Sequence, residues 1–196
     1  MPSDFETGRI VEMENQRLES FMNGFVAAIQ LLNRAGNNGF LVEYVCLATS
    51  VIDAILRIGI ILEYQLKNKT DEVPEKLLYM DERDRIISER EVYRKSLEQG
   101  ILDEKLFHRL NELYQGRNRV IHRYIISDIT TRELLDIGIQ YENIIPAISK
   151  QIAILEERQV RLGVGMTVTG SKVTKAQLDK MAANKHHDTN LSIGLN

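Results

Sequence analysis

The chain has 196 residues, of which 43% are hydrophobic and 27% are charged, and its formal net charge is -3. This composition is typical of a soluble globular protein, and the mild acidity argues against a nucleic-acid-binding surface spread over the whole molecule. The single cysteine, Cys46, has no partner within the chain, so we expect no internal disulfide and a reducing, cytoplasmic location. The acidic first 16 residues lack an apolar core, which argues against a secretory signal.

Apolar residues recur at helical spacing along the chain, and no segment alternates for long with the period of a strand. We therefore predict an all-α fold. A first helix is predicted over about residues 4–34, where Leu18, Phe25 and Leu32 stand seven residues apart on one buried stripe. The stretch AGNNG, residues 35–39, supplies the turn after it.

A second helix is predicted over about residues 40–67. Its segment 41–62 is long and apolar enough to resemble a membrane span, yet it contains Glu43, Asp53 and Arg57, which a lipid-facing helix tolerates badly. We therefore predict a buried helix and no membrane partner.

Weaker patterns follow in the middle of the chain. A third helix is predicted over about residues 81–99 and should end at Gly100. Asp103 is predicted to be the N-cap of a fourth helix. Because Gly116 falls inside that helix, we expect the chain to bend or restart there.

The last long helix has a clear start in the sequence TTRELL. Thr130 and Glu133 form a capping-box pattern, and the apolar periodicity continues to about Leu162 with a kink expected at Pro146. Short connections between long amphipathic helices predict an up-and-down bundle of about five helices over residues 1–162.

The composition changes in residues 163–196 to Gly, Thr, Ser, Asn and Lys, so we predict a C-terminal arm with a short helix near residues 175–184. The stretch GMTVTGSK, residues 165–172, imitates a phosphate-binding loop, but its Ser and Lys stand in the wrong order. His186 and His187 have no spaced carboxylate or cysteine partners, so we assign no metal site and expect no cofactor.

The stretch YQGRNRVIHRY, residues 114–124, is strongly basic within an acidic protein. From residue 105 to residue 124 the only acid is Glu112. The cations and histidines of this segment are Lys105, His108, Arg109, Arg117, Arg119, His122 and Arg123. A local basic patch of this kind indicates a site for a polyanion.

A helical wheel places Arg117 on the same face as Val120, Ile121 and Tyr124. A guanidinium in an apolar sector is costly unless it is paired. The second helix offers partners, because one polar line crosses its otherwise apolar surface. This line consists of Glu43, Ser50, Asp53 and Arg57.

Two interpretations of these charges stay open. Asp53 and Arg57, four residues apart, are more simply explained as an exposed helical pair, and we favour that interpretation for this pair taken alone. Arg119 and Arg123 lie opposite the apolar face and could form a solvated surface, whereas the density of the basic patch favours a site.

The order Arg117-Asn118, three further residues, His122, one residue and Tyr124 resembles the signature of HEPN ribonucleases, and in particular of their HepT-type toxin branch. Residues 92–124 and 51–58 are similar to the segments that accompany this motif in that branch, so the resemblance covers about residues 40–155. It implies a homodimeric helical bundle of HEPN type that acts in a toxin–antitoxin or phage-defence system.

The resemblance also implies roles. Arg117 and His122 would be catalytic, and Tyr124 would be adenylylated by a partner nucleotidyltransferase antitoxin. Metal-free cleavage of RNA needs a proton acceptor, a proton donor and a cation, which histidine and arginine can supply near neutral pH. We expect Asn118, Asp53 and Ser50 to support these groups, and Arg119, Arg123 and Arg109 to bind RNA.

Two other functions stay open on the sequence alone. The first is a non-catalytic HEPN-like module that binds a nucleotide or a protein partner in the same basic cleft. The second is a structural helical adaptor, in which the motif has no chemical role. Cleavage of single-stranded RNA in the presence of a chelator separates the three.

Overall fold

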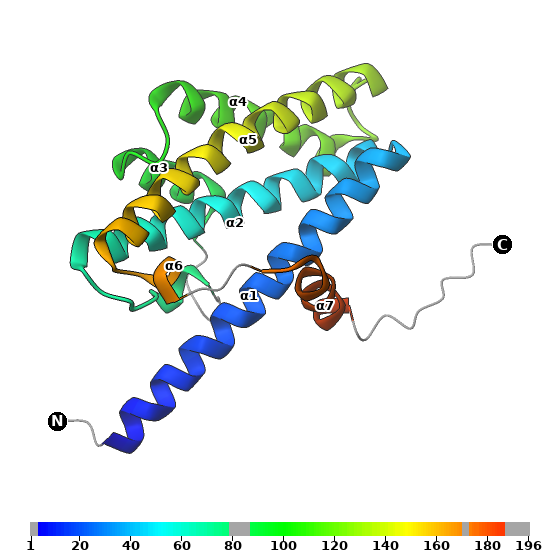
Figure 1. Cartoon of the computed structure of the whole chain (residues 1–196). Coiled ribbons are helices and arrows are strands. Elements are labelled where there is room, and N and C mark those ends of the chain that lie inside the picture. The colour runs from blue at the N-terminus through cyan, green and yellow to red at the C-terminus, as the bar shows by residue number, and fades with distance from the viewer. Residues whose placement is uncertain (1–3, 79–86, 170–172, 187–196) are drawn as a thin grey trace.

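The computed structural model describes residues 4–78, 87–169 and 173–186, with side chains from residue 16 onward except those of Glu75, Thr169 and His186. All regular secondary structure in these ranges is helical (Figure 1), which confirms the all-α prediction. The helices are α1 (Asp4–Asn38), α2 (Leu41–Asn68), the 3-10 turn η1 (Glu75–Leu77), α3 (Glu89–Glu98), α4 (Glu104–Arg123), α5 (Thr131–Leu162), α6 (Met166–Thr169) and α7 (Lys175–His186).

Helix α2 lies at the centre of the bundle and packs against α1, α3, α4 and α5. Figure 1 shows α5 running alongside it, with α3 and α4 on one side and the long helix α1 crossing on the other. Among the described residues, α2 is the helix long and apolar enough to cross a membrane, and 72% of its apolar window is buried inside the fold. Such burial is typical of a core helix, as predicted for this segment.

The helix ends follow local capping chemistry. The Asp103 carboxylate accepts a hydrogen bond of 2.7 Å from the backbone N–H of Leu106, as an N-cap does. Thr130 and Glu133 form the predicted capping box at the start of α5. These interactions confirm both predicted starts.

Helix α4 runs without interruption through Gly116, so the predicted bend or restart was wrong. A glycine inside a helix costs about 1 kcal/mol relative to alanine, which burial of the rest of the helix can offset. A Cβ atom at residue 116 would lie 3.3 Å from Cδ1 of Ile137 on α5. The glycine therefore allows α4 and α5 to approach closely.

Helix α3 begins later than predicted. Ser88 has extended backbone dihedrals, and its hydroxyl accepts a hydrogen bond from the N–H of Glu91, so the helix starts at Glu89. Residues 81–86 of the predicted third helix lie outside the described residues. Gly100, with φ of 72°, follows the end of α3 as predicted.

The described part of the C-terminal arm packs on the bundle. Ala182 of α7 is buried against Val26 and Ala27 of α1. The Gln30 side chain of α1 also donates a hydrogen bond of 3.3 Å to Asp179 of α7. Figure 1 shows α7 seated against the middle of α1, whereas residues 187–196, including His187, lie outside the described residues.

The link between α5 and α6 is held by buried glutamines. The N–H groups of Met166 and Thr167 donate to the side-chain oxygens of Gln65 and Gln159, respectively. The N–H of Gly165 donates to the Asp71 carboxylate at 2.6 Å. These backbone donors are therefore already bound to side chains, so the described part of 165–172 is not arranged as a phosphate-binding loop.

Candidate active site

The second half of α4 brings most of the predicted site residues together. A polar cavity of about 360 Å³ opens beside this helix. It is lined by Tyr114, Gln115, Arg117, Asn118, Arg119, His122 and Arg123. Successive turns of one continuous helix thus place the motif's cations, its amide and its imidazole around one space.

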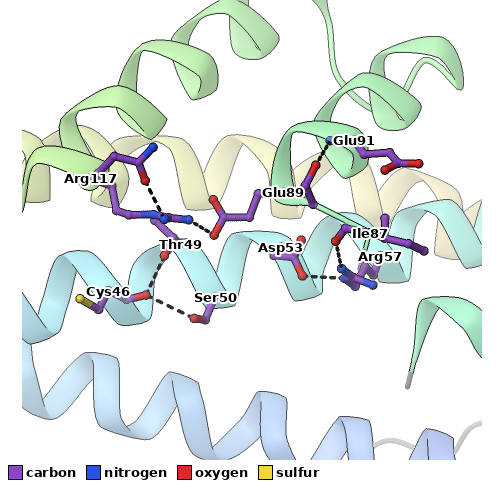
Figure 2. Close-up of polar contacts among 11 residues, drawn as sticks. Cys46, Thr49, Ser50, Asp53, Arg57, Ile87, Glu89, Glu91 and Arg117 are labelled. Atoms are coloured by element: carbon purple, nitrogen blue, oxygen red, sulfur yellow. Dashed lines mark hydrogen bonds and ion pairs between the residues drawn. The ribbon is translucent and has the colours of Figure 1, made fainter. Parts of the chain in front are cut away.

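Arg117 is the most enclosed cation of this cavity, with 13% of its side chain exposed. It forms an ion pair with Glu89 of α3, and its Nη1 donates a hydrogen bond of 2.8 Å to the Asn118 side-chain oxygen. Its guanidinium also lies over the Tyr114 ring, 5.0 Å from the ring centroid. Figure 2 shows Glu89 reaching from α3 across α2 towards Arg117.

The ion-pair partner of Arg117 is therefore Glu89 of α3. Asp53, a possible partner from the polar line of α2, does not pair with Arg117. Asp53 instead accepts a hydrogen bond of 2.6 Å from Nε of Arg57. The remaining guanidinium nitrogens of Arg57 donate to the backbone oxygens of Leu77 and Ile87, at 3.2 and 3.3 Å. Arg57 thus ties the two ends of the connection between η1 and α3 to the central helix.

The exposed-pair interpretation that we favoured for Asp53 and Arg57 was wrong. Their side chains are 21% and 8% exposed, respectively. Burial raises the pKa of Asp53, and the charge and hydrogen bond of Arg57 lower it in part. The pair is buried because α3 and η1 cover α2, which helical spacing alone does not predict.

A second cavity of about 380 Å³ lies on the other side of Arg117. It is lined by Ser50, Asp53, Arg57, Ile87, Ser88, Glu89, Tyr114 and Arg117. Ser50 and Asp53, predicted to support the catalytic groups, therefore share a cavity with Arg117. Neither side chain forms a hydrogen bond with Arg117. The Ser50 hydroxyl donates to the Cys46 carbonyl at 3.3 Å, and Asp53 accepts from Arg57.

Three buried polar atoms of residues that line the second cavity have no hydrogen-bond partner among the described residues. They are Nε of Arg117, Oε2 of Glu89 and Oδ1 of Asp53. A buried donor or acceptor without a partner is costly, and such groups gather at functional sites. The guanidinium of Arg117 therefore has hydrogen-bonding capacity left after its pair with Glu89.

The end of α4 is open to solvent. His122, Arg123 and Tyr124 are exposed, and Tyr124 has 45% of its surface accessible. The wheel places Ile121 on the same face as Val120, but Val120 is buried whereas Ile121 is 40% exposed. The apolar face of α4 is therefore only partly covered at this turn.

The predicted RNA-binding arginines do not all lie at the cavity. Arg119 lines it and forms an exposed ion pair of 3.6 Å with Glu133 of α5. Arg123 also lines it, whereas Arg109 lies about two turns earlier on α4 and is not among the lining residues. The structure therefore brings Arg119 and Arg123, but not Arg109, to the candidate site.

Sequence reasoning missed Glu89, the direct partner of Arg117. The signal that could have found it is Ser88 followed three residues later by Glu91, a capping pattern that starts a helix. That start would have put Glu89 in the first turn of α3. Its pairing across the bundle still depends on the tertiary packing of α3 against α4.

Within the described residues, no cluster of three or more His, Cys, Asp or Glu side chains could hold a metal ion. Comparison of the chain with protein-family models, curated proteins and solved structures found no match. The resemblance to HEPN ribonucleases therefore depends on the sequence motif and its neighbouring segments alone.

Proposed function

We propose that this chain is a HEPN-type endoribonuclease of a toxin–antitoxin or phage-defence system that acts in the cytoplasm. The observation that carries the proposal is the cavity of about 360 Å³ beside α4, which Arg117, Asn118 and His122 line together. An enclosed guanidinium with spare hydrogen-bonding capacity and an exposed imidazole are the groups that metal-free RNA cleavage requires.

In the proposed reaction the 2′-oxygen of a ribose attacks the adjacent phosphorus as a base removes its proton. The bond from phosphorus to the 5′-oxygen breaks, and an acid protonates that oxygen. The products are a 2′,3′-cyclic phosphate and a free 5′-hydroxyl. His122 would exchange the proton, and Arg117 would bind the phosphoryl oxygens, where its planar fork suits two oxygen acceptors.

A second copy of the chain would complete the site. Each chain supplies one motif histidine, whereas the reaction needs a proton acceptor and a proton donor, so we propose a two-fold dimer with facing α4 helices. Exposed apolar side chains at the C-terminal end of α4 support this arrangement. Ile125 and Ile126, which follow the C-cap Tyr124, are 94% and 82% exposed, and Ile121 in the last turn of α4 is 40% exposed.

Tyr124 would be the point of control. It caps the C-terminal end of α4 and is exposed, so a nucleotidyltransferase antitoxin could reach its hydroxyl. An attached adenylate would bring a negative phosphate and bulk to the end of the helix that carries His122, which would compete with RNA. We expect co-expression with such a partner to add one adenylate mass to wild type but not to Tyr124→Phe.

The first experiment compares two histidines on the same helix. His122 lines the cavity, whereas His108 is exposed, lies earlier on α4 and is not among the lining residues. With a single-stranded RNA substrate in EDTA, we expect wild type and His108→Ala to cleave at equal rates and His122→Ala to lose activity. Circular dichroism should show the same helix content in all three. Equal cleavage by His122→Ala would exclude the proposed mechanism.

A non-catalytic HEPN-like module is the second candidate, and the pairing of Arg117 with Glu89 favours it. In this arrangement one arm of the guanidinium is already neutralised by a carboxylate. A module of this kind would bind a nucleotide or a protein through the same cavity. Wild-type protein that binds a nucleotide but never cleaves RNA would select this alternative.

A further inference from the structure

A third cavity, of about 590 Å³, lies between α1, α2 and α5, and Met166 of α6 also lines it. It is larger than the two cavities beside Arg117 and shares no lining residue with either of them. Its volume falls within the range of about 300–1,000 Å³ that is typical of sites for small organic molecules, which in helical bundles lie between the helices. The cavity is therefore separate from the candidate active site and large enough for a ligand of its own.

The residues that line this cavity follow a stripe along each helix. On α2 they extend from Tyr44 to Ile58, and on α5 they extend from Glu142 to Glu156. Each of these spans covers 14 residues, which corresponds to about 21 Å along a helix. Because α2 and α5 run side by side (Figure 1), the cavity is a long groove. A volume of about 590 Å³ along a groove of this length favours a slender ligand.

The walls of this apolar groove consist mainly of aliphatic and aromatic side chains. Phe25 and Ile29 of α1 and Ile145 of α5 line it, and all three are only partly buried against the core. Ile55 and Ile152, which are buried, line it as well. Burial of apolar surface is favourable, so a ligand with an apolar body would be stabilised by covering these side chains.

The charged residues that line the apolar groove are both acidic, Glu142 and Glu156. Partial burial raises the pKa of the Glu156 carboxyl, and no cation among the described residues opposes this shift. A cationic group placed beside Glu156 would supply the missing counter-charge. An anionic group would instead be repelled by both carboxylates.

We infer that the apolar groove binds a long-chain alkyl amine in its ammonium form, with the alkyl chain along α2 and α5 and the ammonium group at Glu156. A fatty acid would bring a like charge to the two glutamates, and a polyamine would make little use of the apolar walls. The inference is independent of the proposed nuclease, because the groove and the cavity that contains His122 share no residue.

The test uses four small probes, each below its critical micelle concentration. Decylamine, decanoate and decanol share one alkyl chain and differ in the charge of the head group. Butylamine keeps the ammonium group but shortens the chain. Binding to the full chain is measured by isothermal titration calorimetry at neutral pH and low salt, and thermal unfolding with each probe is the second readout.

Two neighbouring glutamates of α5 provide the matched variants. Glu156 lines the apolar groove, whereas Glu157 is exposed and is not among the lining residues. We expect wild type and Glu157→Gln to bind decylamine at least about tenfold more tightly than decanol, as one charge-assisted contact would provide. Decanoate and butylamine should bind more weakly than decanol or decylamine, respectively. In Glu156→Gln the preference for decylamine over decanol should disappear.

A third variant fills the apolar groove. Ser149 lies on α5 between Ile145 and Ile152 and lines the groove, and its hydroxyl donates a hydrogen bond to the Ile145 carbonyl. We expect Ser149→Phe to place a ring in the groove and to abolish binding of both decylamine and decanol. Circular dichroism should show an unchanged helix content in all three variants.

Equal affinity of wild type for decylamine and decanoate would overturn the inference, as would an equal loss in Glu157→Gln or an unchanged preference in Glu156→Gln. Normal decylamine binding by folded Ser149→Phe would place the ligand elsewhere and also overturn it. If Ser149→Phe lowers the molecular mass measured by light scattering without any probe, the groove holds a second copy of the chain instead. Decylamine binding as expected by a chain that cleaves no RNA would leave the inference standing while the nuclease fails.

Discussion

Arg57 and Arg117 are both enclosed arginines paired with a carboxylate, but their remaining hydrogen bonds differ. Arg57 uses all three guanidinium nitrogens, on Asp53 and on two backbone carbonyls. Arg117 uses its two terminal nitrogens on Glu89 and Asn118, and its Nε is buried without a partner. The first arginine is fully occupied by the fold, whereas the second is not.

This difference is the one expected between a structural charge and the chemical charge that we propose for Arg117. A buried cation that is satisfied by backbone oxygens cannot turn to a substrate without releasing the connection that it holds. Arg117 lines two cavities, and its Nε could donate a hydrogen bond to a substrate oxygen without breaking a contact that holds the fold together. Burial and pairing are therefore similar in the two arginines, and the unused donor of Arg117 is what distinguishes them.

The largest effect that tests this difference between Arg57 and Arg117 is expected from removal of the Arg117 side chain. We expect Arg117→Ala to lower the RNA cleavage rate by about 1,000-fold, because the transition state loses its cation. Arg109→Ala is the matched control, since it removes the same charge from the same helix away from the cavity, and it should leave kcat and KM close to those of wild type. Stopped-flow or gel-based cleavage assays measure both, and a normal rate for Arg117→Ala would show that Arg117 is structural as well.

Removal of Arg57 should have the opposite outcome. We expect Arg57→Met to lower the free energy of unfolding by about 3 kcal/mol, because Asp53 and two carbonyl groups lose their donors. Urea unfolding measures this loss. Asp53→Asn combined with Arg57→Met should recover part of it, because the buried carboxylate is no longer left unpaired. Cleavage per folded molecule should stay within a few-fold of wild type.

A further test of the role of Arg117 is whether a second copy of the chain packs against the end of α4. Ile125 is almost fully exposed next to the end of α4. We expect Ile125→Asp to raise the dimer dissociation constant at least about tenfold, because a carboxylate would be buried at the interface. Light scattering over a micromolar concentration series measures this constant. Leu135→Asp on α5 makes the same substitution at a second exposed apolar position and serves as the comparison. A monomeric wild type would exclude the composite site.

Much of the backbone could be predicted from the sequence, because caps and periodicity are local. Asp103, Thr130 and Glu133 set helix starts where they were expected. Gly116 shows the limit, since its propensity predicts a break, but α4 continues through it at a point where Ile137 of α5 lies close. Local rules fail where a neighbouring helix supplies the stabilisation.

The candidate site was predictable in composition but not in pairing. The motif placed Arg117, Asn118 and His122 on one helix, and the cavity beside α4 does gather them. The pairs Glu89 with Arg117 and Asp53 with Arg57 depend on how α3 covers α2 and α4. No spacing within one helix carries that information, so the buried state of Arg57 and the role of Glu89 emerged only from the structure.

The smallest effect concerns how fully Arg57 compensates the charge of Asp53. Burial raises the pKa of Asp53 above its ordinary value even though Arg57 partly opposes the shift. Between the ordinary pKa of the unfolded chain and the raised pKa of the folded chain, the folded chain binds more protons at this carboxyl than the unfolded chain does. The contribution of Asp53 to stability therefore decreases as pH rises through that window. On acidification from neutral pH, wild type should therefore gain stability relative to Asp53→Asn. Urea unfolding of both proteins between pH 7 and about pH 4 measures the difference, with Asp71→Asn as a control for a carboxylate outside this pair. A relative loss of wild-type stability on acidification would mean that the attraction of Arg57 lowers the pKa of Asp53 more than burial raises it. The Asp53–Arg57 pair would then stabilise the fold as an ion pair and not only through the hydrogen bonds of Arg57 to the backbone.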